Sequence, residues 1–291
     1  MLEIIDSHIH LWSPDTVTPP WLIDAPALNR TFGLEEWRAA AGEGDEFHLA
    51  AAVYVEIDAA PEDLATENRI VFSMTADPAN PVKGAVIAAR LSQGDIEAQL
   101  APWLSDKGLK GARQVLHMPT AAPGLCLEPL FIANLKKLGR LRLAFDACMR
   151  PDELSDLAQA AEAAPETTII LDHAGNPGDA FFAGGMDQPT LALWRQGLRQ
   201  LAALDNVYCK ISGLTLPNDA GIRKAQGALD ALVDSFGEDR VMFASNFPVN
   251  RLGTASRPWI DFLISATARR GTAWQAKFFG ENAARAYRLD D

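Results

Sequence analysis

Residues 5–12 read Ile5-Asp6-Ser7-His8-Ile9-His10-Leu11-Trp12, a strand-like run that carries two histidines two positions apart. Side chains two apart on a β-strand point to the same face, so both imidazoles project to one side of the first predicted strand. There they lie close enough to hold one metal ion or one substrate oxygen. The chain has only five histidines, so two on one face favour a functional site over a solvated surface strand.

Outward from this run, short β-rich segments alternate with amphipathic ones, which predicts parallel pairing through right-handed crossovers. Eight such units in 291 residues favour an α/β fold, a closed (β/α)8 TIM barrel with an extra C-terminal helix, as a single domain over residues 1–291. The predicted strands span residues 3–9, 50–57, 82–90, 109–116, 141–147, 167–172, 206–211 and 240–245. The predicted helices span residues 34–41, 60–75, 95–104, 127–139, 151–163, 188–204, 220–236, 257–270 and 272–287.

Three loops rich in Gly and Pro follow predicted strand ends, at residues 13–33, 118–124 and 174–187. In a TIM barrel the C-terminal ends of the strands carry the active site. We therefore expect these loops to line a ligand cleft.

The net charge of −12 gives the molecule a field that repels phosphate backbones and anionic membrane surfaces. No apolar run approaches ~18 residues, and the first strand begins too early to leave room for a signal peptide. Three scattered cysteines without CxxC spacing favour free thiols in a reducing compartment. We expect a cytoplasmic enzyme that acts on a small molecule, without nucleic-acid or membrane partners; a homodimer is left open.

Polar side chains collect at the C-terminal ends of different predicted strands. Beyond strand one, they are Glu56, Arg113, His117, His173, Lys210, Ser212 and Asn246. Taken singly, His117 could be a loop histidine, Lys210 a strand-edge lysine and Glu56 a surface charge. Their convergence, with four of the five histidines at one edge, favours an active site. Asp172 and His173 are adjacent in a predicted strand, so their side chains point to opposite faces. This favours an orienting or structural role for Asp172.

The run Asp6–Trp12 resembles the opening of the amidohydrolase-related branch of the amidohydrolase superfamily. More narrowly, it resembles the group of sugar lactonases and 2-pyrone-dicarboxylate lactonases. Matching runs follow in the right order over nearly the whole chain: Lys110–Arg113, Leu171–Pro177, Tyr208–Leu214, Phe236–Phe243 and Gly280–Arg285. The HxH pair alone is moderately specific, but the ordered matches together are strong.

The resemblance implies a distorted TIM barrel that hydrolyses a ring ester or a related carbonyl. It implies a site built from His8, His10, His173 and a strand-eight aspartate, with Arg113 receiving a carboxylate or polarising a carbonyl. Some members hold one divalent metal, zinc or manganese, here on His8, His10 and His173, and some lactonases work without metal. Strand five supplies no histidine and strand four no bridging carboxylate, so a two-metal site is not expected.

One position departs from the family pattern: Ser245-Asn246-Phe247-Pro248 stands where the family usually has Ser-Asp-Trp-Pro. An aspartate accepts a proton from water and a neutral amide does not, although Asn246 can orient water or ligate a metal through its oxygen. Four explanations stay open. The reaction differs, catalysis is lost, the asparagine is an engineered change, or water is activated by another group among His173, His10, Glu56 and Asp172.

The first hypothesis is a hydrolase that opens a lactone of a sugar acid or small carboxylic acid. Water attacks the ring carbonyl, guided by His173 and Asn246, while Arg113 and His10, with or without a metal, stabilise the oxyanion. The predicted substrate-binding residues are Trp12, Glu56, His117 and Lys210. The alternatives are a metal-dependent decarboxylase of the same superfamily, which Asn246 argues against, and a barrel that binds a small ligand without turnover.

Overall fold

Eight parallel strands form one sheet in which each strand pairs with the next along the chain. The computed structural model describes residues 1–178, 181, 185–216 and 218–290. Residues 179–180 and 182–184 of the predicted loop 174–187 lie outside the described residues. The strands are β1 (Leu2–Ile9), β2 (Phe47–Val55), β3 (Val82–Ala88), β4 (Leu109–Val115), β5 (Ala144–Cys148), β6 (Ile169–Leu171), β7 (Val207–Ile211) and β8 (Val241–Phe243).

The barrel closes where β1 meets the segment that follows β8. The backbone N–H of His10 donates to the Phe247 carbonyl at 2.7 Å, and the N–H of Asn246 donates to the His8 carbonyl at 3.0 Å. The buried carboxylate of Asp6 strengthens this seam, since it accepts the Ser245 N–H at 2.9 Å. The predicted (β/α)8 barrel is therefore confirmed.

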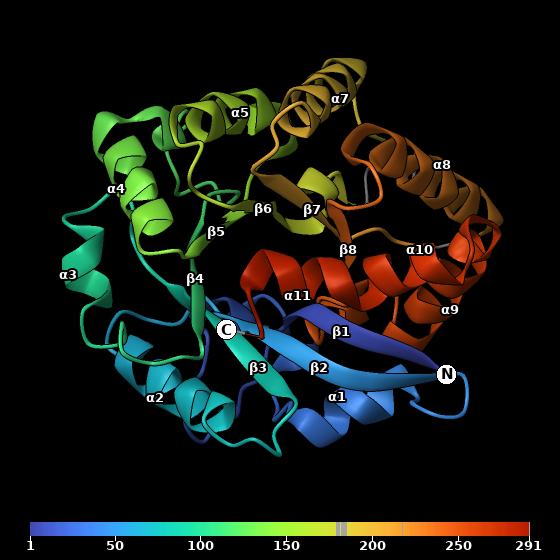
Figure 1. Cartoon of the computed structure of the whole chain (residues 1–291), viewed down its shortest axis with the longest axis horizontal. Coiled ribbons are helices and arrows are strands. Elements are labelled where there is room, and N and C mark those ends of the chain that lie inside the picture. The colour runs from blue at the N-terminus through green and yellow to red at the C-terminus, as the bar shows by residue number, and fades with distance from the viewer. Residues whose placement is uncertain (179–180, 182–184, 217, 291) are drawn as a thin grey trace.

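Helices surround the barrel (Figure 1). They are α1 (Leu34–Ala41), α2 (Leu64–Thr75), α3 (Ile96–Leu100), α4 (Pro129–Arg140), α5 (Leu154–Ala163), α7 (Gln188–Ala202), α8 (Asp219–Phe236), α9 (Ser256–Thr267), α10 (Thr272–Ala276) and α11 (Asn282–Tyr287). A π-helical turn, Lys277–Glu281, joins α10 to α11, so helical structure spans residues 272–287 as predicted. Helix α3 ends at Leu100 instead of residue 104, because Pro102 has no N–H to donate to the helix. Within the described part of the chain, no helix has the length and apolar character needed to cross a bilayer.

Strand side chains alternate between two apolar regions. The larger region lies between the strands and the surrounding helices. The smaller one fills the barrel itself and consists of Val53, Val55, Val86, Ala144, Ile170 and Met242, with Ala283, Ala286 and Tyr287 of α11 packed against them. Helix α11 therefore closes one end of the barrel, where it crosses in front of the strands (Figure 1), and leaves the opposite end for polar groups.

Helices α5 and α7 pack closely at Gly197, where a Cβ would lie 2.3 Å from the Cβ of Leu154. Overpacking of such a contact strains both helices, so Gly197→Ala should lower the free energy of unfolding by about 1–3 kcal/mol in chemical denaturation. Gly227→Ala in α8 is the matched control, because no atom lies within 4 Å of its added Cβ. The control should raise stability by about 0.5–1 kcal/mol. A neutral or stabilising Gly197→Ala would contradict the close helix contact.

Candidate active site

A cavity of about 290 Å³ lies at the C-terminal ends of the strands. The predicted site residues that line it are His10, Arg113, His117, His173 and Asn246. Each of the three predicted loops contributes to its wall, through Trp21, Met118 and Asn176 respectively. The strand ends and the loops thus form one cleft, as expected from their positions in the sequence.

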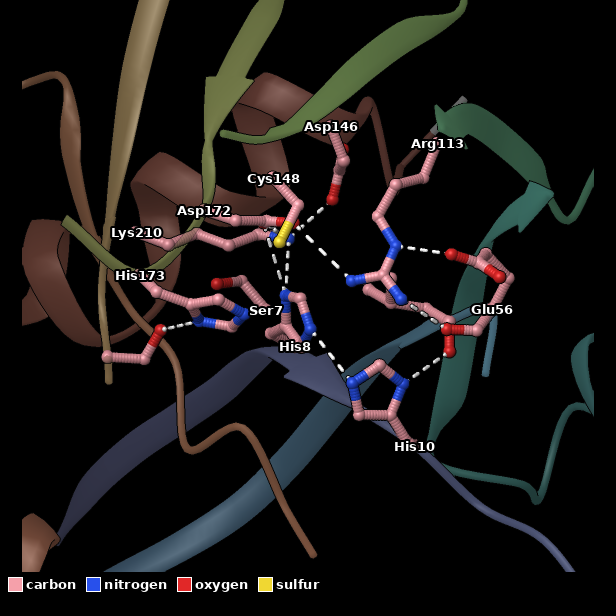
Figure 2. Close-up of polar contacts among 12 residues, drawn as sticks. Ser7, His8, His10, Glu56, Arg113, Asp146, Cys148, Asp172, His173 and Lys210 are labelled. Atoms are coloured by element: carbon pink, nitrogen blue, oxygen red, sulfur yellow. Dashed lines mark hydrogen bonds and ion pairs between the residues drawn. The ribbon is translucent and has the colours of Figure 1, made fainter. Parts of the chain in front are cut away.

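The histidines of β1 meet the histidine that follows β6. The Nε2 atoms of His8 and His10 are 3.1 Å apart, and the ring centroids of His8 and His173 are 4.6 Å apart. Figure 2 shows the three rings around one centre, with His8 between the other two. Residues separated by more than 160 positions therefore share one group of imidazoles.

A turn after β6 brings both Asp172 and His173 to the site. The strand ends at Leu171, and His173 and Ala174 then adopt left-handed conformations, with φ of 53° and 51°. In this turn, adjacent side chains no longer point to opposite faces as they do in a strand. The expectation that Asp172 points away from the side of His173 therefore does not apply. Gly213 leaves room for the turn, because a Cβ there would lie 2.8 Å from the Cβ of His173.

A network of buried charges lies beside His8 (Figure 2). Lys210 Nζ lies 2.5 Å from Asp146 Oδ2 and 3.0 Å from Asp172 Oδ1. It also lies 3.0 Å from His8 Nδ1. Burial opposes the charge on Asp172, but the ammonium of Lys210 outweighs it and holds the pKa of this carboxyl well below its usual range. The network therefore contains an ionised carboxylate with no access to solvent.

Arg113 is held in place from two sides. Its Nε donates to Glu56 Oε1 at 2.5 Å, and Nη2 donates to the Glu56 carbonyl at 2.7 Å. Nη1 lies 3.6 Å from Asp172 Oδ2. Because its partners lie just after β6 and just after β2, the guanidinium reaches the cavity in a fixed orientation.

The three imidazoles are neutral at physiological pH. Burial lowers the pKa of His10 to about 3, with Arg113 adding to the effect, and burial lowers the pKa of His173 to about 4. Burial, and then Lys210, hold the pKa of His8 well below its ordinary value. Each ring therefore carries one N–H and one lone pair.

Three predicted substrate-binding residues lie outside the lining of this cavity. Lys210 is fully buried in the charge network, and Glu56 binds Arg113. Trp12 is buried, donates its indole N–H to the Leu28 carbonyl at 3.2 Å and packs edge-on against Trp21. These side chains are placed to support the cavity wall, whereas His117, the fourth prediction, faces the cavity directly.

The sequence analysis did not identify Asp146, Cys148 or Tyr287 as site residues. Cys148 lines the cavity with its Sγ 3.2 Å from His117 Nδ1, and burial raises the pKa of this thiol to about 12. The hydroxyl of Tyr287 donates to Asp146 at 2.7 Å. The one available signal was Asp146 itself, a charged residue inside an otherwise apolar strand.

Among the described residues, one cluster could hold a metal ion: ligand atoms of His8, Asp172 and His173 lie within 4.8 Å of one another. Two imidazoles and a carboxylate form a ligand set that catalytic zinc uses. Neither Asp172 oxygen accepts a hydrogen bond from the described residues, although cationic side chains lie at ion-pair distance. The donor set therefore fits a divalent ion. His10, predicted as a ligand, is not in this cluster and faces His8 instead.

Comparison with known proteins identifies the family. A family model described as Amidohydrolase matches residues 5–289. The chain belongs to the amidohydrolase family. The resemblance drawn from the sequence motifs is thereby confirmed, and the protein is a hydrolase.

Relatives of this amidohydrolase match it along almost its whole length. It is 29% identical to an L-fucono-1,5-lactonase from Burkholderia multivorans, over 99% of this chain and 96% of the relative. It is 30% identical to the solved structure of Amidohydrolase 2 from Bifidobacterium longum subsp. infantis, with a TM-score of 0.77 and 99% of both chains covered. A zinc-bound amidohydrolase from Burkholderia multivorans is 26% identical, with a TM-score of 0.84 over 99% of this chain and 100% of that chain.

A second buried carboxyl lies next to Glu56, on α2. Glu67 Oε1 accepts hydrogen bonds from the Tyr54 hydroxyl at 2.8 Å and from the Ile57 N–H at 3.0 Å. Burial, and then the charge of Glu56, raise the pKa of Glu67 to about 8 from an ordinary value of 4.5. Between these two values the folded protein keeps a proton that the unfolded chain releases.

Folding stability should therefore fall as pH rises from about 5 to 8, because Glu67 alone contributes a slope of up to about 1.4 kcal/mol per pH unit. Glu67→Gln removes the titrating group, so its stability should depend less steeply on pH. Urea denaturation at pH 5, 6, 7 and 8 measures both slopes. Glu62→Gln, an exposed residue just before α2, is the control and should keep the wild-type slope. A Glu67→Gln variant with an unchanged slope would refute this assignment.

Proposed function

We propose that this amidohydrolase opens a lactone of a sugar acid or a small carboxylic acid by water attack on the ring carbonyl. The observation that carries the proposal is the placement of a fixed guanidinium, Arg113, and a neutral imidazole, His173, on the wall of one cavity. An ester hydrolysis needs both a group that stabilises an oxyanion and a group that accepts a proton from water. The relative named L-fucono-1,5-lactonase supports a sugar-acid lactone as the substrate class.

His173 is the proposed general base. Its Nδ1 lies 2.8 Å from the Ser212 hydroxyl oxygen, which fixes the ring plane. When Nδ1–H donates to Ser212, Nε2 carries the lone pair that takes the proton from water. The amide of Asn246, also on the cavity wall, orients this water without adding the charge that an aspartate would bring.

Arg113 is the proposed oxyanion donor. Its contacts with Glu56 and Asp172 hold it before substrate arrives, so little reorganisation accompanies the developing charge. His10 is not part of this proposed oxyanion site, although the sequence analysis predicted that role. Its Nδ1 faces the Val55 carbonyl at 2.8 Å and must donate there, so a neutral His10 has no proton to donate to an oxyanion in the cavity.

A divalent ion, zinc or manganese, would be held by His8, Asp172 and His173 and would act as a Lewis acid towards the ring carbonyl. Its support is the donor set of this chain and the zinc bound in the similar amidohydrolase from Burkholderia multivorans. The role of His173 as general base applies to the metal-free protein, because its single lone pair cannot bind an ion and accept a proton at the same time.

Replacement of the proposed base tests the function. His173→Asn should lower kcat/KM for sugar-acid lactones, L-fucono-1,5-lactone among them, by about 10²–10⁴, because the proton acceptor is lost. A pH-indicator assay measures acid release. His48→Asn, an exposed histidine at the start of β2, is the matched control and should keep the wild-type rate. Full activity of His173→Asn would exclude the role, and release of CO2 from aromatic acids would point to the decarboxylase alternative.

The asparagine at the end of β8 gives a second test. Asn246→Asp places a carboxylate next to the attacking water and should raise kcat/KM by about tenfold or more. Asn250→Asp, four residues further along the chain and outside the lining of this cavity, is the control. A ligand that raises Tm without product formation, in both wild type and Asn246→Asp, would instead support a barrel that only binds.

A further inference from the structure

We infer that Lys210 is a built-in cation that competes with a divalent metal for His8 and Asp172 and so keeps metal binding weak. The inference concerns this chain's own lysine and does not depend on which substrate the enzyme opens. It rests on the position of one ammonium group and on the direction of three consecutive hydrogen bonds.

The ammonium group contacts two of the three members of the metal cluster. Lys210 Nζ lies 3.0 Å from both His8 Nδ1 and Asp172 Oδ1, and these two acceptor atoms are themselves 3.2 Å apart. Asp146 completes the surroundings at 2.5 Å. All four side chains are completely buried, so no solvent screens the repulsion between the ammonium and an incoming dication.

The hydrogen bonds run in one direction from Lys210 to Val55. A carbonyl only accepts, so His10 Nδ1 carries the proton that bonds Val55 at 2.8 Å. A neutral His10 then has its lone pair on Nε2, which must accept from His8 Nε2–H at 3.1 Å. His8 Nδ1 therefore carries the remaining lone pair, and it accepts from Lys210.

This arrangement leaves no nitrogen of His8 available to a metal. Nε2 is protonated, and the lone pair of Nδ1 is occupied by the ammonium. A metal ligand must be an unprotonated nitrogen, so an ion can bind His8 only after Lys210 has moved away. Lys210 thereby supplies the positive charge that the two carboxylates, Asp146 and Asp172, would otherwise draw from a metal.

Calorimetric titration of zinc chloride into metal-stripped protein tests the inference. Lys210→Met should bind zinc at least tenfold more tightly than wild type, because the competing charge is removed. Lys277→Met is the matched control, since Lys277 also lies between two carboxylates, those of Glu238 and Asp239, but on the surface. It should bind zinc like wild type. A folded Lys210→Met variant with unchanged or weaker zinc affinity would overturn the inference.

A second variant and a second measurement keep the inference testable if Lys210→Met does not fold. Lys210→Met combined with Asp146→Asn removes one charge of each sign, and this double variant should also bind zinc at least tenfold more tightly than wild type.

In the native metal-free protein, ¹⁵N NMR of the histidine rings should show His8 protonated on Nε2 and His10 on Nδ1. Each signal is assigned by its loss in the corresponding His→Asn variant. A His8 ring protonated on Nδ1 would overturn the inference without any lysine variant.

Discussion

The ion pairs of Lys210 with Asp146 and Asp172 are the interaction on which the site depends. They join β7, β5 and the turn after β6, three elements whose side chains would otherwise repel or remain unpaired in the barrel interior. Burying such charges is costly, and only mutual contact makes it tolerable. Through His8 and His10 the same network reaches β1 and β2, so a single charged centre orients groups from five parts of the barrel.

The fold was predictable because the barrel repeats one simple pattern. Eight β-rich runs separated by amphipathic segments leave few topologies, and the eight strands lie where they were expected, to within a few residues. The larger differences are local. The strand predicted over 141–147 begins only at Ala144, because the backbone N–H groups of Arg142 and Leu143 still bond to the preceding helix α4.

The site was predictable only in part. Strand order and the HxH run sufficed to bring His10, Arg113, His117, His173 and Asn246 to one cavity. The roles of Lys210 and Asp146 were not predictable, because they depend on which residues of neighbouring strands lie side by side and on how deep each lies in the barrel. The rule that adjacent strand residues point to opposite faces also fails at Asp172, where the backbone leaves the strand conformation. Tyr287 comes from a helix, so no strand pattern could place it.

The hydroxyl of Tyr287 reaches the centre of the barrel from α11 and completes the surroundings of Asp146. This partner is encoded more than 140 residues after the carboxylate that it contacts. During translation, all eight strands leave the ribosome before this tyrosine does, so its hydrogen bond to Asp146 is the last contact of this network that the chain can form. Completion of the buried network around Asp146 is therefore tied to near-completion of the polypeptide, so a prematurely shortened product would carry the histidines without this part of their surroundings.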